Sequence, residues 1–546
     1  MRATRPAPEG EARRYRERGY WRDVCADEYL AWCAREFGDR VAVVDRGRRA
    51  TYKEIDEQAS RFAAGLVGLG VRPGDVVAFQ LPNWLEAVIA YQGIMKVGAI
   101  ANPIVPIYRG KELRFILRQG SAKVAVIPAQ YRDFDYVNLY EGLRPELPNL
   151  ETVIVLGDAP RSMTSWESFM ATAAVEDKAS IQAINDRTRN ADDVALLLYT
   201  SGTTAEPKGA LHSHNTLIYD VHSMGEWFSL NERDVIFNPS PATHITGVLC
   251  ALNMPFVLGA KVVLQDIWDE STAIELVSTE KATFMIFATP FLRGMTHSAE
   301  LRKHDVSSIR YIVCGGADIP IDLMRLATER LGTVVRQYGA TEAPSTTCTN
   351  LRDPVRRRLE TDGRWMLPTV GYVSDKNGEP VPPGTTGEVV WKGPDMFLGY
   401  LDPELNNEAF TASGFFRTGD IGVMDNDGYL NIRGRQKDII NRGGEKISAR
   451  EIEDMIAGHP DVVEVAVVAM PDPVLGEKSC AYIVLDDQAE ISADDILRHL
   501  ESQDIAKQKL PERIEFVNSL PKTASGKIQK FILREQIWRT ASHQNP

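Results

Sequence analysis

The stretch VALLLYTSGTTAEPKG, residues 194–209, is the most informative part of the chain. Residues 194–198 are apolar and predict a buried strand. The loop that follows offers hydroxyl donors and a backbone that can approach a ligand closely, at Ser201, Gly202, Thr203 and Thr204. Lys208 adds a positive charge, so the stretch predicts a polyphosphate site. Because Pro207 stands where a Walker A loop has glycine, the kinase and GTPase mechanism does not apply.

Around this stretch, amphipathic segments alternate with short β-branched runs from residue 51 to about residue 301, which predicts α/β layers. Two further strands are predicted at 309–313 and 333–337, and each is followed within two residues by glycine. Ligands of open α/β sheets bind at the carboxyl ends of strands. We therefore expect the loops after these strands to line the same site as the polyphosphate loop.

A domain boundary is indicated by seven glycines between residues 414 and 446. Beyond it the pattern predicts a small α+β domain, with helices at 448–456 and 493–503 and strands at 462–470, 480–485 and 513–517. The fold class is therefore α/β. We expect a large N-terminal domain at 1–434, with layered sheets and a small β subdomain, and a smaller mobile α+β domain at 435–546.

The composition excludes several classes of protein. The 546 residues carry 62 Lys and Arg against 75 Asp and Glu, a formal net charge of −13, so nucleic acid and anionic membranes are not expected partners. The arginine-rich start lacks the apolar segment of a signal peptide, and no run is apolar enough to span a membrane. Six scattered cysteines without a CxxC pair suit a reducing compartment. The expected location is cytoplasmic.

Several short motifs then appear in order along nearly the whole chain: TYKE at 51–54, KVGA at 96–99, QYGATE at 337–342, FRTGD at 416–420, GRQKD at 434–438 and PKTASGK at 521–527. With residues 199–209, this series resembles the adenylate-forming enzymes, which include acyl-CoA synthetases, luciferases and peptide-synthetase adenylation domains. The resemblance implies that a carboxylate attacks the α-phosphate of ATP, giving an acyl-adenylate and pyrophosphate. Two anions must then be brought together against their repulsion.

The resemblance also implies roles for single residues. Lys527, Glu342 and Thr203 are the expected catalytic residues, with Mg2+ bridging phosphate oxygens through Glu342, the only expected metal ligand. Asp420 is expected to accept hydrogen bonds from the ribose hydroxyls, near Arg435. The expected ATP-binding residues are Thr200, Ser201, Gly202, Thr203, Thr204, Lys208, Gly316, Ala317, Gln337, Tyr338, Gly339, Thr341, Glu342, Asp420, Ile432, Arg435 and Lys527.

The acyl pocket is expected near His244, at the gate position of the resembling enzymes. Adenylation domains that take amino acids tend to place aspartate after this position, to pair with the substrate ammonium. Here Ile245 stands there, which favours a plain organic acid. The expected acyl-binding residues are His244, Thr246, Gly247, Val248, Cys314, Gly315, Ala340 and Ala343, mostly small and apolar.

A compact apolar acid therefore fits, and residues 243–247 with 266–269 are similar to cyclohexanecarboxylate and medium-chain acyl-CoA ligases. The function that we expect is an ATP-dependent acid–CoA ligase. Aryl acids remain an alternative, as do transfer to a separate carrier protein and oxidation of the adenylate as in luciferases. A non-catalytic relative would be expected to lose Lys527, Asp420 or Glu342, and the chain has all three.

For the CoA step, the resemblance implies that the small domain rotates about a hinge at Lys437. In the rotated pose Arg442, Gly443, Gly444 and Lys446 would line the channel for the CoA thiol. Besides the acid, ATP and CoA, the candidate partners are a second copy in a homodimer and a protein acetyltransferase that modifies Lys527. His212 and His214 have no metal-ligand spacing around them, and we expect the run Arg356–Arg358 to be solvated.

Overall fold

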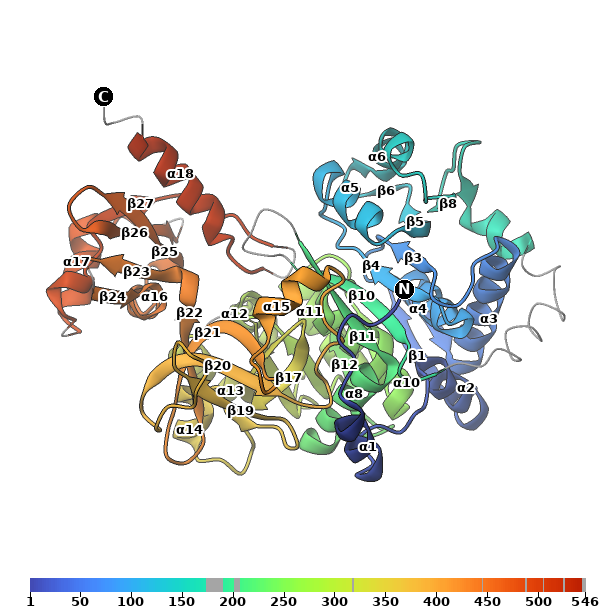
Figure 1. Ribbon diagram of the computed structural model, residues 1–546, viewed down its shortest axis with the longest axis horizontal. Coiled ribbons are helices and arrows are strands. Elements are labelled where there is room, and N and C mark those ends of the chain that lie inside the picture. Colours follow the sequence, from blue (N-terminus) through green and yellow to red (C-terminus); the bar gives the residue numbers. More distant parts are fainter. Residues whose placement is uncertain are drawn as a thin grey trace.

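The structure is a computed structural model that describes residues 1–172, 190–200, 207–316, 319–443, 445–486, 489–503, 505–523 and 526–542. It has a large N-terminal domain built on several sheets and a smaller C-terminal domain (Figure 1). The predicted mixed α/β class is thereby confirmed.

The largest sheet has nine strands in the order β18-β17-β16-β15-β14-β12-β13-β1-β2. Its six central strands, β16, β15, β14, β12, β13 and β1, pair in parallel. Antiparallel strands form the edges, with β2 beside β1 and with β17 and β18 beside β16. The bounds are β1 Val41–Asp45, β2 Arg48–Thr51, β12 Val235–Asn238, β13 Lys261–Leu264, β14 Phe284–Phe287, β15 Tyr311–Gly315, β16 Thr333–Ala340, β17 Ala343–Cys348 and β18 Arg364–Trp365.

A second sheet of seven strands has the order β11-β10-β4-β3-β5-β8-β9. Its bounds are β3 Val76–Phe79, β4 Ile100–Pro103, β5 Ala122–Pro128, β8 Thr152–Leu156, β9 Thr164–Ser165, β10 Val194–Thr200 and β11 Lys208–Ser213. β10 and β11 form the antiparallel hairpin that carries the predicted phosphate loop, with Thr200 opposite Lys208. Residues 201–206 between them lie outside the described residues. A short pair, β6 Gln130–Tyr131 and β7 Phe134–Asp135, lies apart from this sheet.

Helices pack between and around these sheets. They are α1 Glu9–Glu17, α2 Ala26–Glu36, α3 Tyr52–Gly68, α4 Leu85–Val97, α5 Gly110–Gln119, α6 Tyr136–Leu143, α8 His214–Phe228, α9 Ile245–Gly247, α10 Met254–Leu258, α11 Glu270–Glu280, α12 Thr289–His297, α13 Ile321–Arg330, α14 Val355–Glu360 and α15 Asn406–Ala409. The first turn of α3 is fixed by Thr51 and Glu54, which cap each other's backbone amides. Nearly every residue of α4 is buried, because the helix is apolar around its whole circumference.

A four-stranded antiparallel sheet forms the small β subdomain, with β19 Val370–Ser374, β20 Thr386–Lys392, β21 Phe416–Met424 and β22 Leu430–Arg435. The small domain follows directly, with β23 Ile439–Arg442, β24 Glu445–Ser448, α16 Ala449–Ala457, β25 Val462–Asp472, β26 Gly476–Leu485, α17 Ala493–Glu501, β27 Arg513–Phe516 and α18 Lys530–Ser542. The change of sheet falls between Arg435 and Ile439. The boundary at residue 434 stays a prediction.

The elements expected in the small domain are present, and three further ones were not predicted: β23, β24 and helix α18. Helix α18 follows the predicted catalytic loop and packs along β25, burying Leu533 and Ile537. Figure 1 shows α18 as the long red helix at the edge of the small domain. No helix within the described ranges combines the length and the apolar composition that crossing a bilayer requires.

Candidate active site

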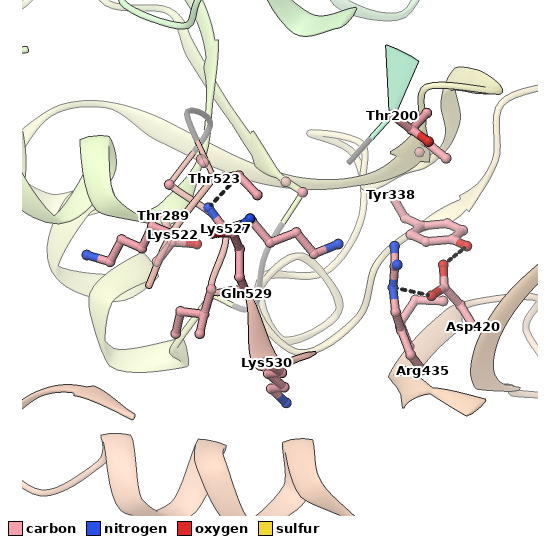
Figure 2. A pocket seen from close by; sticks show the side chains of 18 of the residues that line it. Thr200, Thr289, Tyr338, Asp420, Arg435, Lys522, Thr523, Lys527, Gln529 and Lys530 are labelled. Carbon is pink, nitrogen blue, oxygen red and sulfur yellow. Dashed lines mark hydrogen bonds and ion pairs between the residues drawn. The ribbon is translucent and has the colours of Figure 1, made fainter. Parts of the chain in front are cut away.

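A cavity of about 2190 Å3 lies where the two domains meet. Its walls come from the ends of β15 and β16, from β21 and β22, and from the loop before α18. Figure 2 shows Tyr338 and Asp420 of the large domain, with Arg435 at the end of β22, on one side and Thr523 and Lys527 of the small domain on the other. Loops that are far apart in the sequence therefore share one site.

Asp420 is held between an aromatic hydroxyl and a guanidinium. It lies opposite Arg435 across β21 and β22, and Arg435 Nε lies 3.2 Å from Asp420 Oδ1. The Tyr338 hydroxyl donates to Asp420 Oδ2 over 2.6 Å (Figure 2). Burial, and then the Asp420 carboxylate, raise the pKa of Tyr338 well above its ordinary value, so the phenol stays a donor. Each carboxylate oxygen has a second lone pair, which leaves acceptor capacity for a ligand.

Glu342 sits in the turn between β16 and β17, and three contacts fix this turn. The Tyr400 hydroxyl donates to Glu342 Oε1 over 2.6 Å, and the Phe397 amide donates to the Glu342 carbonyl over 2.8 Å. His212 Nε2 donates to the Thr341 carbonyl over 2.7 Å. The turn must also be tight, because a side chain at Gly339 would lie 1.9 Å from the Pro344 carbonyl oxygen. The carboxylate of Glu342 is thereby held at the cavity wall.

Lys527 enters from the small domain on a short hairpin. Its amide donates to Thr523 Oγ1 over 3.1 Å, and its carbonyl accepts from the Thr523 amide over 2.8 Å. The hairpin lies against the start of α12, since a side chain at Gly526 would reach within 3.2 Å of Pro290. The Arg435 guanidinium, and then burial, lower the pKa of Lys527 to about 8. A cation of the small domain thus faces the large domain.

Lys437 lies in the segment that joins the two domains and also lines the cavity. Burial, and then the Arg435 guanidinium, lower its pKa to about 8. Arg534 of α18 donates to the Lys437 carbonyl over 2.9 Å and lies 2.7 Å from Asp438 Oδ1. The segment is therefore attached to the small domain by its backbone, while the Lys437 ammonium faces the cavity.

The geometry agrees with the comparisons to known proteins. The pattern of the AMP-binding enzyme family matches residues 30–401, and that of the AMP-binding enzyme C-terminal domain matches residues 451–527. The chain belongs to the AMP-binding enzyme family. It is 36% identical to a medium-chain fatty-acid–CoA ligase of Escherichia coli, over 96% of this chain and 92% of that protein. It is 32% identical to a 2,3-dihydroxybenzoate-AMP ligase of Bacillus subtilis, over 97% of both chains.

Solved structures of other AMP-binding enzymes have the same fold. An anthranilate CoA ligase in complex with anthranoyl-AMP is 27% identical, with a TM-score of 0.86 over 95% of this chain and 98% of that one. MatB from Rhodopseudomonas palustris gives a TM-score of 0.82 when ATP is bound, at 29% identity over 94% and 99% of the two chains. Its apo structure gives 0.70, at 28% identity over 95% and 100%. Because both are structures of one protein, the chain more closely resembles the ATP-bound arrangement.

This AMP-binding enzyme is an adenylate-forming acid ligase, and enzymes of this class use ATP. Most of its expected ATP-binding residues line the cavity: Thr200, Lys208, Gly316, Gln337, Tyr338, Gly339, Thr341, Glu342, Asp420, Ile432, Arg435 and Lys527. The expected residues Ser201, Gly202, Thr203, Thr204 and Ala317 lie outside the described residues.

The expected acyl-binding residues divide into two groups. His244, Thr246, Gly315 and Ala340 line the cavity. Gly247, Val248, Cys314 and Ala343 are buried instead in the packing behind the cavity wall. For Cys314 the reason is strand alternation: Gly315 faces the cavity, so its neighbour on β15 points to the opposite face, among the residues of α12 and α13.

Two of the expected CoA-binding residues, Arg442 and Gly443, do not line the cavity in this arrangement. Arg442 pairs with Glu512 over 2.6 Å, and Gly443 packs against Leu475. Gly444 and the side chain of Lys446 lie outside the described residues. Two residues of the arginine run have acidic partners, since Arg356 pairs with Glu360 and Arg357 with Asp425 and Asp427.

The residues that hold the site residues in place were not predicted from the sequence. Tyr400 bonds Glu342, and His212 bonds Thr341 rather than pairing with His214, whose Nδ1 accepts from the Ala26 amide over 3.2 Å. A buried polar side chain next to a motif is a signal for such a role. The partner, however, lies 58 residues away for Tyr400 and 129 for His212, so sequence alone does not identify it.

Because His212 is buried, we expect the free energy of unfolding to fall in acid. The side chain is fully buried, and burial lowers its pKa to about 4, against about 6.5 for an unfolded histidine. The unfolded state therefore binds the extra proton, and stability is lost as pH falls from about 6.5 towards about 4. The slope is at most about 1.4 kcal/mol per pH unit for this group. We expect His212→Gln to reduce the pH dependence of urea unfolding between about pH 7 and about pH 5. An unchanged slope would contradict this assignment.

The lowered pKa of Lys527 predicts that the rate of adenylation declines at alkaline pH. Its charged form is the one that can stabilise phosphate charge, so kcat/KM for ATP should fall as pH rises through about 8. Lys527→Arg should move this limb to higher pH, because arginine stays charged. Lys527→Ala should lower the rate about 10²–10³-fold below about pH 8, and by less at higher pH, where the wild-type lysine also loses its charge. Lys437→Arg is the control, since the pKa of Lys437 is also about 8. If only Lys437→Arg shifts the limb in pyrophosphate exchange, Lys527 is not its source.

Proposed function

We propose that the chain is an ATP-dependent acid–CoA ligase for a compact apolar carboxylic acid, such as a cyclohexanecarboxylate-like acid or a short- or medium-chain fatty acid. It would form an acyl-adenylate and pyrophosphate and then transfer the acyl group to CoA, releasing AMP. The medium-chain fatty-acid–CoA ligase that is 36% identical over 96% of this chain supports this choice.

The observation that favours an acid without a charged tail is the neutral character of His244 and its apolar neighbours. Burial, and then the Lys527 ammonium, lower the pKa of His244 to about 4, so the imidazole is neutral near neutral pH. Its Nδ1 accepts a hydrogen bond from the Thr246 amide, and Ile245 and Ile286 also line the cavity. A charged tail, such as an α-ammonium, would be desolvated against this wall without a partner.

The charges of the cavity fit ATP. Lys208 would hold the β- and γ-phosphates, Lys527 would stabilise the charge that develops around the α-phosphate, and Asp420 would accept from the ribose hydroxyls. The Glu342 carboxylate is the oxygen donor that Mg2+ prefers, and it lines the same cavity. Mg2+, when bound, would neutralise phosphate charge. The carboxylate of the acid is ionised near neutral pH, so attack requires no general base.

For the CoA step we propose that the small domain, 435–546, turns about Lys437. Arg442 and Gly443 lie on the hairpin of β23 and β24 and are remote from the cavity, so they could act on CoA only after such a rotation. Gly444 and Lys446 belong to the same proposed channel. Cytoplasmic location, a homodimer and acetylation of Lys527 stay predictions; acetylation would remove the lysine charge.

An aryl acid is the second candidate, with CoA or a carrier protein as the acceptor. It is favoured by the 2,3-dihydroxybenzoate-AMP ligase that is 32% identical over 97% of this chain, and by the fold shared with an anthranilate CoA ligase. An aromatic ring is also apolar and compact. The wall around His244 therefore does not distinguish the two classes of acid.

The deciding experiment measures acid-dependent pyrophosphate exchange with cyclohexanecarboxylate, benzoate, salicylate and straight-chain acids. We expect the highest kcat/KM for an alicyclic or medium-chain acid, and AMP release that depends on CoA. Preference for a hydroxybenzoate, with AMP release that depends on a phosphopantetheinylated carrier protein, would support the second candidate. Absence of exchange with every acid would refute both.

The hinge proposal predicts that the two half-reactions separate. Proline at 437 restricts its own φ and disfavours the helical conformation of Gln436, so Lys437→Pro should impede rotation. We expect pyrophosphate exchange close to that of Lys437→Ala, which lacks the same ammonium, and slower thioester formation than in Lys437→Ala. Equal rates for the two variants in both half-reactions would remove Lys437 from the hinge.

A further inference from the structure

Residues 398–401 form a short extended segment between the four-stranded sheet and the hairpin of β10 and β11. On one edge it bonds to β11: the Leu398 amide donates to the Leu211 carbonyl over 2.7 Å, and the Leu401 amide donates to the Gly209 carbonyl over 2.7 Å. Tyr400 lies opposite Ala210 in this ladder. The segment is therefore joined to the strand that begins at Lys208, immediately after the predicted phosphate loop.

The other edge of this segment is covered by the N-terminal arm, defined here as residues 1–7. The Arg5 amide donates to the Leu398 carbonyl over 2.8 Å. Thr4 Oγ1 lies 2.7 Å from the Tyr400 carbonyl oxygen and 3.2 Å from the Leu398 carbonyl oxygen. Figure 1 shows the dark-blue start of the chain crossing this region beside β11. The arm thus pairs with the Leu398 and Tyr400 carbonyls, the second of which also accepts from Asn406 Nδ2 over 3.3 Å.

Two features show that this contact is closely fitted. Gly399 has φ +90°, and a side chain there would lie 2.6 Å from Thr4 Oγ1, so the arm can approach only because residue 399 is glycine. The Arg5 guanidinium lies 3.5 Å from the centre of the Phe410 ring. Asn406 completes the contact, since its Nδ2 lies 3.2 Å from Thr4 Oγ1 and its Oδ1 accepts from the Tyr400 amide over 2.9 Å.

Tyr400 connects this contact to the cavity. Its hydroxyl donates to Glu342 Oε1 over 2.6 Å, and the Lys208 ammonium lies 5.2 Å from the centre of its ring. Burial, and then the Glu342 carboxylate, raise the pKa of Tyr400 well above its ordinary value, so it remains a donor. One side chain therefore touches both the proposed metal ligand and the proposed phosphate-binding cation.

We propose that the N-terminal arm is a positioning element of the ATP site, in which Thr4 fixes the backbone of Tyr400, and Tyr400 orients Glu342 and packs its ring against Lys208. This inference rests on the proposed roles of Glu342 and Lys208. Thr4 and Tyr400 are positioning residues, because they act through these two side chains. Glu342 fits Mg2+ by its donor type, and the Tyr400 hydroxyl fixes which way its carboxylate faces.

The test compares the affinity for ATP with Mg2+ and the affinity for ATP with EDTA, both by calorimetry. Tyr400→Phe retains the ring beside Lys208 and removes only the hydroxyl. A hydrogen bond to a charged group is lost, so we expect about tenfold weaker binding of ATP with Mg2+ and less than about twofold change with EDTA. Equal weakening of both affinities, or no change in either, would overturn the orienting role of Tyr400.

The arm is tested in the same way by Thr4→Val, which removes the hydroxyl and preserves the shape of the side chain. We expect about threefold weaker binding of ATP with Mg2+, little change with EDTA, and recovery in Thr4→Ser. Thr328→Val is the matched control, because Thr328 Oγ1 also donates to a backbone carbonyl, that of Met324 over 2.8 Å, and lies on α13 away from the cavity.

The outcomes separate this inference from the proposed function. The readout is the ratio of the affinity for ATP with Mg2+ to the affinity for ATP with EDTA. An equal ratio in Thr4→Val and Thr328→Val would overturn the role of the arm. A Thr4→Ser variant that does not restore the wild-type ratio would also overturn it. These binding measurements need no acid substrate. Wild-type protein that binds ATP with Mg2+ but exchanges pyrophosphate with none of the acids would refute the proposed function and leave the positioning role standing.

Discussion

The cavity brings several positively charged side chains together, and their mutual repulsion affects how the two domains dock. Arg435 is the largest cause of the lowered pKa of Lys527, and it adds to burial in lowering the pKa of Lys437, on which Lys208 also acts. Like charges gathered in a partly buried space oppose the docking of the small domain. Asp420 and Asp438 offset part of this repulsion, since each lies beside an arginine. A polyphosphate between the domains would turn the remaining repulsion into attraction, which links nucleotide binding to domain closure.

The fold was largely predictable because its signals are local. Apolar runs that end in glycine predicted β15 and β16, and the elements of the small domain follow the periodicity of their own residues. Helix α18 was missed for the same reason. In its described part the apolar residues come in two short runs, at 531–533 and 537–538, of which only Leu533 and Ile537 are buried, so no regular apolar stripe marks the helix. Its position depends on packing against β25.

The site was predictable where a motif loop follows a strand. Asp420 and Arg435 lie opposite each other because β21 and β22 pair in that register. The orienting residues were not predictable, because their partners are distant in sequence: His212 acts on Thr341, and Thr4 on Tyr400. The acyl wall was predicted in part, since proximity in sequence to His244 or Gly315 does not decide which face of a strand or turn a side chain occupies.

The contact between Thr4 and Tyr400 also bears on how the protein is made. The two residues are 396 positions apart, so the ribosome produces the donor long before its acceptor exists. Until residues 398–401 have been translated and paired with β11, Thr4 and Arg5 lack the carbonyl partners that this segment provides. The contacts of Thr4 and Arg5 are thus among the last to form in the large domain, and the surroundings of Tyr400 are complete only when they have formed.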